Sequence, residues 1–371
     1  MPSKMMRAAR MHAVGQPMQI DMIERPVPQA TDVVVEVKAC GMVPNLGNVL
    51  ANWPAWCPHL PQPDLPAVFG LDPAGVIVEV GSQVVGLQPG DRVYVNPVRA
   101  CGSCPACLSD NRVACEYFVF NGYFGFSKEK SQTIYDLYPH GGFCEYMGAP
   151  QSAIIKLADN MSFEEAARLG YMGTAYSALR KFGHLAGKSL IINGVSGTLG
   201  LSATLFALAM GASRIFGTGR NHTLLERVRA LAPNRIEVFS TEDGSISDWV
   251  RTRTDGHGAH FMVDTLGAAV SLDIFDDAMH GVARGGTIVN IGGTVGKLAI
   301  DMKWLMDNSM KLIGSAWFTS TEGYDIVEML RSQTIDLSIL QHEVAKLDDI
   351  NRAISGIGAR HGGFSNYVIV P

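Results

Sequence analysis

Four closely spaced cysteines constrain the fold of this 371-residue chain more than any other feature of its sequence. Cys101, Cys104, Cys107 and Cys115 form a C-x2-C-x2-C-x7-C pattern. One loop can therefore wrap four thiolates around a tetrahedral ion, for which zinc is the natural occupant. The rivals are an iron–sulfur cluster, which the long final gap disfavours, and paired disulfides, which a reducing compartment disfavours. With sulfur at every position, such an ion would stabilise a lobe and leave no open site for a substrate.

The composition is that of a well-buried globular protein with a small-molecule partner. Apolar residues make up 47% of the chain and charged residues 18%, and the net charge is −5. Because there is no run of Lys or Arg, we expect neither nucleic acid nor an acidic membrane surface as a partner. The N-terminus lacks a signal-peptide core, and no stretch approaches the roughly 20 apolar residues of a membrane span. We therefore expect a cytoplasmic protein.

Strand and helix signals divide the chain into two regions and predict an α/β fold. Short strands punctuated by Gly and Pro are expected at residues 33–37, 75–80 and 91–95, in a β-rich, barrel-like region. Ser162 and Glu165 form a capping box where helical structure begins. From residue 188 onward strands alternate with helices, which implies a parallel sheet covered by helices. A helix near 324–331 and a strand at 367–370 are expected to return to the first region.

The cysteine pattern has a context that points to a known family. It follows Gly-Asp-Arg-Val at 90–93 and precedes Gly-Gly-Phe-Cys-Glu-Tyr at 141–146. In this setting it resembles the structural-zinc lobe of the medium-chain dehydrogenase/reductase superfamily, the zinc alcohol dehydrogenases. The resemblance runs through nearly the whole chain. It implies an oxidoreductase with one structural zinc per chain and a homodimeric or homotetrameric assembly through the edge of the nucleotide-binding sheet, at about 287–318.

The same resemblance implies a division into two domains. A GroES-like, β-rich catalytic domain would comprise residues 1–165 and 318–371, with the zinc lobe at about 98–116. A Rossmann domain, built on a doubly wound parallel sheet, would bind NADP(H) with residues 166–317.

A glycine-rich segment at residues 193–200, Asn-Gly-Val-Ser-Gly-Thr-Leu-Gly, lies between a predicted strand and a predicted helix. Glycines there let backbone amides approach a pyrophosphate at the helix N-terminus, although a simple turn is the alternative. The spacing G-x-x-G-x-x-G is similar to the loop of the quinone-oxidoreductase branch, whose members generally work without zinc. The residues expected to contact the cofactor here are Gly194, Ser196, Gly197, Thr198 and Leu199.

The end of the next strand favours NADP(H) over NAD(H). An NAD site usually has an acidic residue about 20 residues after the loop, and in this chain Gly219 stands at that position. Arg220 can pair with a 2′-phosphate, and Asn221 follows it. The alternative is that Arg220 lies at the solvent-exposed start of the next helix and binds no cofactor. The resemblance adds further cofactor contacts at Thr174, Leu266, Ile291 and Gly292.

The three ligands of the family's catalytic zinc are absent. In the segments that resemble those carrying a cysteine, a histidine and a second cysteine, this chain has Val43, Leu71 and Gly170. None of these residues can bind a metal, so zinc-alkoxide chemistry is excluded at this place. A shifted site of Cys57, His59 and Asp72 is an alternative that lacks familiar ligand spacing.

Without a Lewis acid, hydride can still pass to an electrophilic C=C or C=O if a donor stabilises the developing oxyanion. The candidates are Asn45, in the place of the family's relay hydroxyl, Asp72 if protonated, and Tyr171. Asn48 stands where an outer relay histidine is often found.

Two tryptophans, Trp53 and Trp56, predict an apolar wall for an apolar or aromatic substrate. We therefore expect an NADP(H)-dependent oxidoreductase acting on an activated enone, quinone or carbonyl. The alternatives are an alcohol dehydrogenase for simple alcohols and ketones and a non-catalytic NADPH-binding protein.

Overall fold

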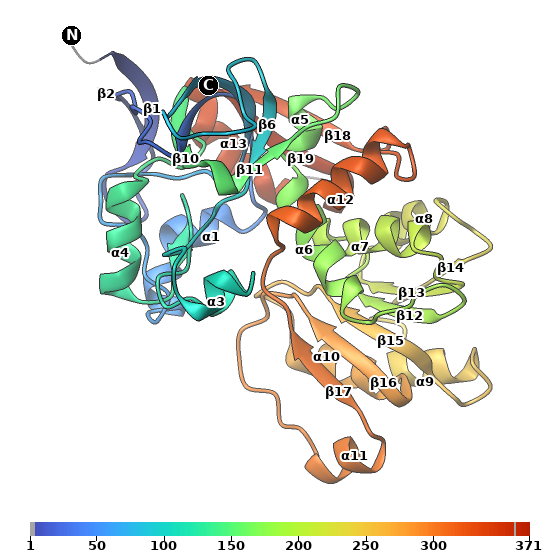
Figure 1. The fold of residues 1–371 in the computed structure, drawn as a ribbon. Coiled ribbons are helices and arrows are strands. Elements are labelled where there is room, and N and C mark those ends of the chain that lie inside the picture. The colour runs from blue at the N-terminus through green and yellow to red at the C-terminus, as the bar shows by residue number, and fades with distance from the viewer. Residues whose placement is uncertain (1–3, 360) are drawn as a thin grey trace.

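Two valine-rich strands, β3 (Asp32–Gly41) and β5 (Asp72–Val80), pair antiparallel at the centre of the first sheet. A computed structural model describes residues 4–359 and 361–371. In it the sheet has the order β11-β6-β5-β3-β19-β18, and one further strand, β10, also pairs with β3 (Figure 1). The other strands of this sheet are β6 (Arg92–Val95), β10 (Tyr146–Pro150), β11 (Ile154–Lys156), β18 (Gln341–Lys346) and β19 (Ser365–Val370).

Smaller elements surround this sheet in the first region. One small sheet contains β1 (Met5–Met11), β2 (Gln19–Glu24) and β4 (Ala67–Val68), and another contains β7 (Val98–Arg99), β8 (Val119–Phe120) and β9 (Phe124–Gly125). The helices are α1 (Leu46–Ala51), α2 (Trp53–Trp56), α3 (Pro105–Leu108) and α4 (Lys128–Leu137). The β-rich character was predicted, whereas α4 was not.

A second sheet of six strands is parallel throughout, with the order β14-β13-β12-β15-β16-β17. This is the strand order of dinucleotide-binding sheets. Its strands are β12 (Ser189–Asn193), β13 (Arg214–Gly219), β14 (Ile236–Ser240), β15 (Ala259–Asp264), β16 (Val282–Asn290) and β17 (Lys311–Gly314). Its helices are α7 (Thr198–Ala209), α8 (His222–Arg229), α9 (Ile246–Thr252), α10 (Leu272–His280) and α11 (Met302–Asp307). All five residues of β12 are buried, as expected for a strand covered on both faces.

Helices α5 (Phe163–Ala166) and α6 (Leu169–Arg180) connect the two sheets. The predicted capping box of Ser162 and Glu165 is confirmed at the start of α5. On the return path, α12 (Ser320–Arg331) begins earlier than predicted because Thr319 and Glu322 form a second capping box. The predicted final strand is confirmed as β19, which pairs with β3 through Val368 and Gly41.

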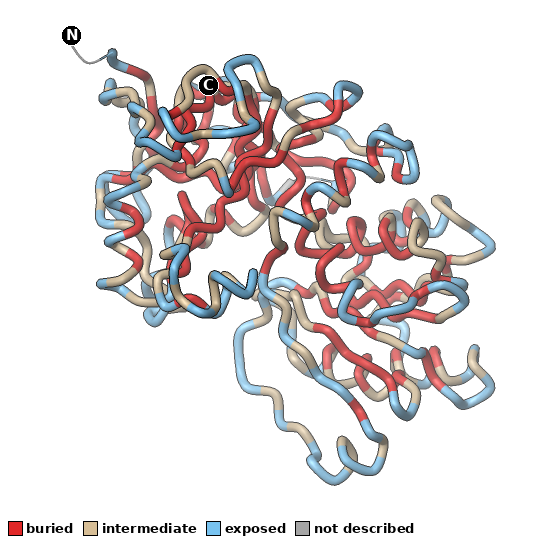
Figure 2. The backbone as a smooth tube through the Cα atoms, in the orientation of Figure 1, coloured by how far each residue is buried: buried red, intermediate tan, exposed pale blue. Residues whose placement is uncertain are grey.

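The core extends through both regions. Figure 2 shows the central strands of both sheets buried and the connecting loops largely exposed. No helix within the described ranges combines the length and the apolar character needed to span a bilayer.

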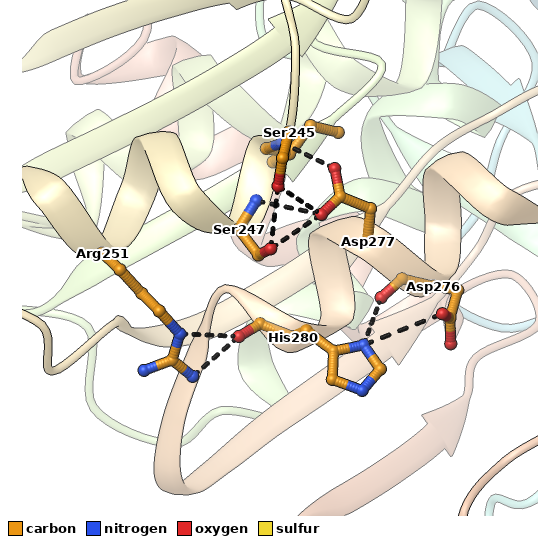
Figure 3. A network of polar contacts seen from close by, with 7 residues as sticks. Ser245, Ser247, Arg251, Asp276, Asp277 and His280 are labelled. Carbon is orange, nitrogen blue, oxygen red and sulfur yellow. Dashed lines mark hydrogen bonds and ion pairs between the residues drawn. The ribbon is translucent and has the colours of Figure 1, made fainter.

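A partly buried carboxylate joins α9 to α10 in the second region (Figure 3). Asp277 of α10 accepts hydrogen bonds from the backbone N–H groups of Ile246 and Ser247 and from the hydroxyls of Ser245 and Ser247. Burial raises the pKa of Asp277, but these hydrogen bonds outweigh it and leave the pKa below its usual value. The side chain of the neighbouring Asp276 lies 3.8 Å from the partly exposed His280 ring, which also contacts the Asp276 backbone carbonyl at 2.8 Å.

We predict that Asp277→Ala lowers the free energy of unfolding by about 1–3 kcal/mol, because buried donors lose their acceptor. The matched control Asp276→Ala should change it by less than about 1 kcal/mol, because exposed pairs contribute little. Since the folded-state pKa of Asp277 is depressed, its contribution is present above the unfolded pKa and is lost as the pH falls through the folded value. Urea unfolding of both variants at neutral and acidic pH tests this, and equal losses for both variants would contradict it.

Candidate functional site

The four cysteines of the predicted cluster are brought together by the loop around α3. Their sulfur atoms all lie within 4.8 Å of one another, with 3.6 Å between Cys115 and Cys101. Four thiols at this separation suit a tetrahedral ion, and binding would release their protons. In the described ranges this is the only group of three or more His, Cys, Asp or Glu side chains that could hold a metal. The alternative site of Cys57, His59 and Asp72 is therefore not formed.

The glycine-rich loop has the geometry of a phosphate cradle at the start of α7. Gly194 has a φ of +87°, which a larger residue would adopt only under strain. A Cβ atom at Gly200 would lie 2.2 Å from the carbonyl oxygen of Gly194, so only glycine allows the helix to approach. Gly197 is the N-cap residue of α7, and the buried Thr198 Oγ1 has no hydrogen-bond partner. The backbone amides at the start of α7 and the Thr198 hydroxyl are suitable donors for a pyrophosphate.

Buried polar groups support this loop from the carboxyl ends of three strands. Asn193 of β12 donates to Asp264 of β15 at 2.8 Å and accepts from the hydroxyl of Thr218 of β13 at 2.6 Å. Burial raises the pKa of Asp264 to about 7, against the hydrogen bonds from Asn193 and Leu266. The loop after β16 lies against this network, because a Cβ atom at Gly292 would be 2.5 Å from Asp264 Oδ2.

The other expected cofactor contacts lie at this same edge of the sheet or next to it. Leu266 and Ile291 directly follow the ends of β15 and β16, and the N–H of Ile291 donates to Asp264. Leu199 lies in the first turn of α7. Thr174 lies on α6, buried, with its hydroxyl donating to Gly170 O.

The end of β13 lies close to Ser196 and Leu225. A Cβ atom at Gly219 would lie 3.3 Å from Ser196 Oγ and 3.2 Å from Leu225. Arg220 is exposed, and its guanidinium has no partner in the described part of the chain. The N-cap of α8 is Asn221, whose side chain accepts from the N–H of Leu224. Arg220 therefore stays outside the helix and is available to a ligand.

The place of the missing catalytic ligands is filled by a carboxylate. Asp72, only 1% exposed, pairs with Gly41 across β5 and β3 and lies next to Leu71. A Cβ atom at Gly170 would lie 2.0 Å from Asp72 Oδ1, so the carboxylate occupies the volume of any side chain at that position. The hydroxyl of Tyr94 donates to Asp72 Oδ1 at 2.7 Å. Burial raises the pKa of Asp72 to about 7, against hydrogen bonds from Tyr94 and from the N–H of Gly170.

Two aromatic side chains, Trp317 and Phe318, pack against the same stretch of α6 as Asp72 does. The Trp317 ring would lie 2.7 Å from a Cβ atom at Gly170, and the Phe318 ring 2.2 Å from one at Gly173. Trp317 has a φ of +65°, a strained conformation for a bulky residue that persists only where its surroundings impose it. Its indole N–H donates to the buried Asn96 at 3.0 Å. Sequence reasoning missed Trp317 and Tyr94, because no local signal places them beside Asp72.

The predicted proton donors come from three separate segments of the chain. Asn45, at the N-cap of α1, is hydrogen-bonded to the buried Tyr123, which the sequence did not single out. Tyr171 lies half-buried in the first turn of α6, and its catalytic role stays a prediction. Of the expected tryptophan wall, Trp53 packs on Phe124 with ring centroids 4.8 Å apart, whereas Trp56 is 43% exposed.

We predict that Gly170→Ala destabilises the protein by about 1–3 kcal/mol, because the added methyl group overlaps Asp72 and Trp317. The matched control is Gly47→Ala in α1, where nothing lies within 4 Å of the added atom. That change should be neutral or stabilise by up to about 1 kcal/mol. Thermal and urea unfolding measure both, and a Gly170→Ala protein as stable as the control would refute the packing described here.

Comparison with known proteins finds relatives for both sheet regions. Residues 29–159 match the alcohol dehydrogenase GroES-like domain, and residues 198–332 match the zinc-binding dehydrogenase domain. An alcohol dehydrogenase from Geobacillus stearothermophilus is 30% identical over 349 residues, which cover 93% of this chain and 94% of the relative. A probable D-xylulose reductase A from Aspergillus clavatus is 26% identical, with coverages of 93% and 92%. The structure of an alcohol dehydrogenase from Thermus sp. ATN1 is similar with a TM-score of 0.81 at 23% identity, covering 98% of this chain and 99% of that chain.

Proposed function

Because this chain belongs to the zinc alcohol dehydrogenase-like medium-chain dehydrogenase/reductase superfamily, we propose that it is an NADP(H)-dependent oxidoreductase that reduces an activated C=C or C=O bond without a catalytic zinc. One observation supports the absence of a catalytic zinc. The Asp72 carboxylate fills the volume beside Gly170, where the family's third zinc ligand would project. Val43 and Leu71, at the other two ligand positions, are buried and apolar.

The chemistry follows from what replaces the metal. The nicotinamide cofactor, when bound, supplies the hydride. Without a Lewis acid the acceptor must already be electrophilic, as in an enone, a quinone or an activated carbonyl. Asp72 holds a proton over part of the neutral range because burial raises its pKa to about 7. In this proposal Asp72 and the amide of Asn45 make the pocket favourable for a developing oxyanion, with Tyr171 as a further candidate.

The cofactor preference rests on the end of β13. Arg220 is exposed and directly follows Gly219, which stands where an NAD site has an acid. An acid at this position would repel a 2′-phosphate, whereas a guanidinium pairs with it through two N–H groups. Gly219 and Arg220 therefore favour binding of NADP(H) over NAD(H).

The proposed assembly is a homodimer or homotetramer that pairs through the edge strand β17. Leu312 on this strand and Met302 and Met306 on α11 are 39%, 68% and 68% exposed. Figure 2 shows the chain segment around α11 as largely exposed. Large apolar side chains gathered at an unpaired strand edge suit a contact with a second copy.

A second candidate function is the oxidation or reduction of simple alcohols and ketones, which the name of the Geobacillus relative favours. In that case saturated ketones would be better substrates than their conjugated counterparts.

We predict that the purified protein contains one zinc per chain and oxidises NADPH with conjugated enones, quinones or aromatic aldehydes. Elemental analysis and NADPH absorbance measure the two quantities. Two zinc ions per chain would contradict the absence of a catalytic metal. Preference for saturated ketones would favour the second candidate, and tight NADPH binding without oxidation by any acceptor would indicate a non-catalytic protein.

We predict that Arg220→Ala raises the KM for NADPH by about 10- to 100-fold and leaves the KM for NADH nearly unchanged, because only the 2′-phosphate loses a charged hydrogen bond. The matched control is Arg229→Ala at the far end of α8, where the exposed guanidinium pairs with Glu226. Steady-state kinetics with both cofactors measures the effect. An unchanged ratio of the two KM values in Arg220→Ala would rule out this role.

A further inference from the structure

Three asparagine side chains form a hydrogen-bonded ladder along α1. Asn52 Nδ2 donates to Asn48 Oδ1 at 3.2 Å, and Asn48 Nδ2 donates to Asn45 Oδ1 at 2.9 Å. The Asn45 side chain is in turn hydrogen-bonded to Tyr123. The ladder thus ends at a buried phenol.

The ladder has a direction. The other two amides donate toward Asn45, whose Oδ1 accepts from Asn48, and the Asn45 side chain forms its further hydrogen bond with Tyr123. Burial and the nearby Asp72 raise the pKa of Tyr123, whereas the hydrogen bond from Asn45 lowers it. Among the described residues, Asn45 is the one side-chain hydrogen-bond partner found for the Tyr123 hydroxyl.

The backbone holds Tyr123 close to Asp72. The N–H of Gly70 donates to the carbonyl of Gly122 at 3.2 Å, and a Cβ atom at Gly122 would lie 2.8 Å from the carbonyl oxygen of Gly70. Asp72 follows this crossing by two residues on one segment, and Tyr123 by one residue on the other. The phenol also stands beside Trp53, with ring centroids 6.3 Å apart.

The neighbouring groups are either less exposed than Tyr123 or unable to give up a proton. The proton of Tyr94 is already given to Asp72, and both side chains are at most 1% exposed. Carboxamides such as Asn45 do not give up a proton in the neutral pH range. Tyr123 is 8% exposed, which is more than either buried partner.

We infer that Tyr123 is the catalytic proton donor of the reaction and that Asn45 orients its hydroxyl. This inference rests on the proposed function. The electrophilic carbon receives the hydride and forms a C–H bond, and the π electrons move to the carbonyl or enolate oxygen. That oxygen takes the proton as the O–H bond of Tyr123 breaks. The phenolate is stabilised by the Asn45 N–H and recovers its proton from water.

The test compares Tyr123→Phe with Tyr135→Phe, which removes another buried hydroxyl, one without a hydrogen-bond partner, on α4. We expect Tyr123→Phe to lower kcat by about 100- to 10,000-fold, as for loss of a general acid. The Kd for NADPH, measured by fluorescence, should stay within about twofold. Tyr135→Phe should keep wild-type kcat. Asn45→Leu should lower kcat by a smaller factor, because the phenol remains.

A second measurement does not depend on turnover. In the non-reacting complex with NADP⁺ and carbonyl-¹³C benzaldehyde, the hydrogen bond from Tyr123 should shift the C=O stretch to lower frequency. The shift should persist in Tyr135→Phe and disappear in Tyr123→Phe.

A wild-type kcat in Tyr123→Phe, or a C=O stretch at the same frequency in Tyr123→Phe as in the wild-type protein, would overturn the role of Tyr123. If none of the acceptors tested supports NADPH oxidation by the wild-type protein, the proposed function fails instead. The C=O stretch then still decides whether Tyr123 donates to a bound carbonyl.

Discussion

The overlap between the Asp72 carboxylate and any side chain at Gly170 is the constraint on which the rest of the site depends. A cysteine could not project from α6 while this carboxylate and the Trp317 ring lie where they do. Burying the carboxylate costs free energy, which the hydrogen bond from Tyr94 and the N–H of Gly170 partly offset. What remains is a polar group that can exist in its neutral form near pH 7. In the proposed function this group serves proton chemistry at a place where the family binds a metal.

The same packing ties the two sheet regions together. Trp317 and Phe318 follow β17 of the parallel sheet and pack against Gly170 and Gly173 of α6, while Asn96 of the first region accepts the indole N–H. The positive φ of Trp317 is the strain that this arrangement imposes. Both glycines of the Gly-x-x-Gly segment on α6 are needed because aromatic rings take the space of their side chains.

The cysteine lobe and the nucleotide edge keep the family's architecture, and the proposed difference in chemistry lies between them. Four sulfur atoms within 4.8 Å can hold a lobe closed without contacting a substrate. At the sheet edge, Asn193 and Asp264 fix the ends of β12 and β15, so the glycine loop rests on buried hydrogen bonds rather than on side chains of its own. The proposed binding of a cofactor therefore does not depend on a catalytic metal.

Local spacing in the sequence was sufficient to predict the cysteine cluster, the glycine loop before α7 and the alternation that builds the parallel sheet, because these depend on residues close together in the chain. The resemblance to the family also predicted that Val43, Leu71 and Gly170 stand in place of catalytic metal ligands. The sequence could not identify Tyr94, Tyr123 or Trp317, nor that Asp72 occupies the volume beside Gly170. Those relations join residues up to 245 positions apart, between Asp72 and Trp317. They arise only when the packing of both sheets against α6 brings these side chains together.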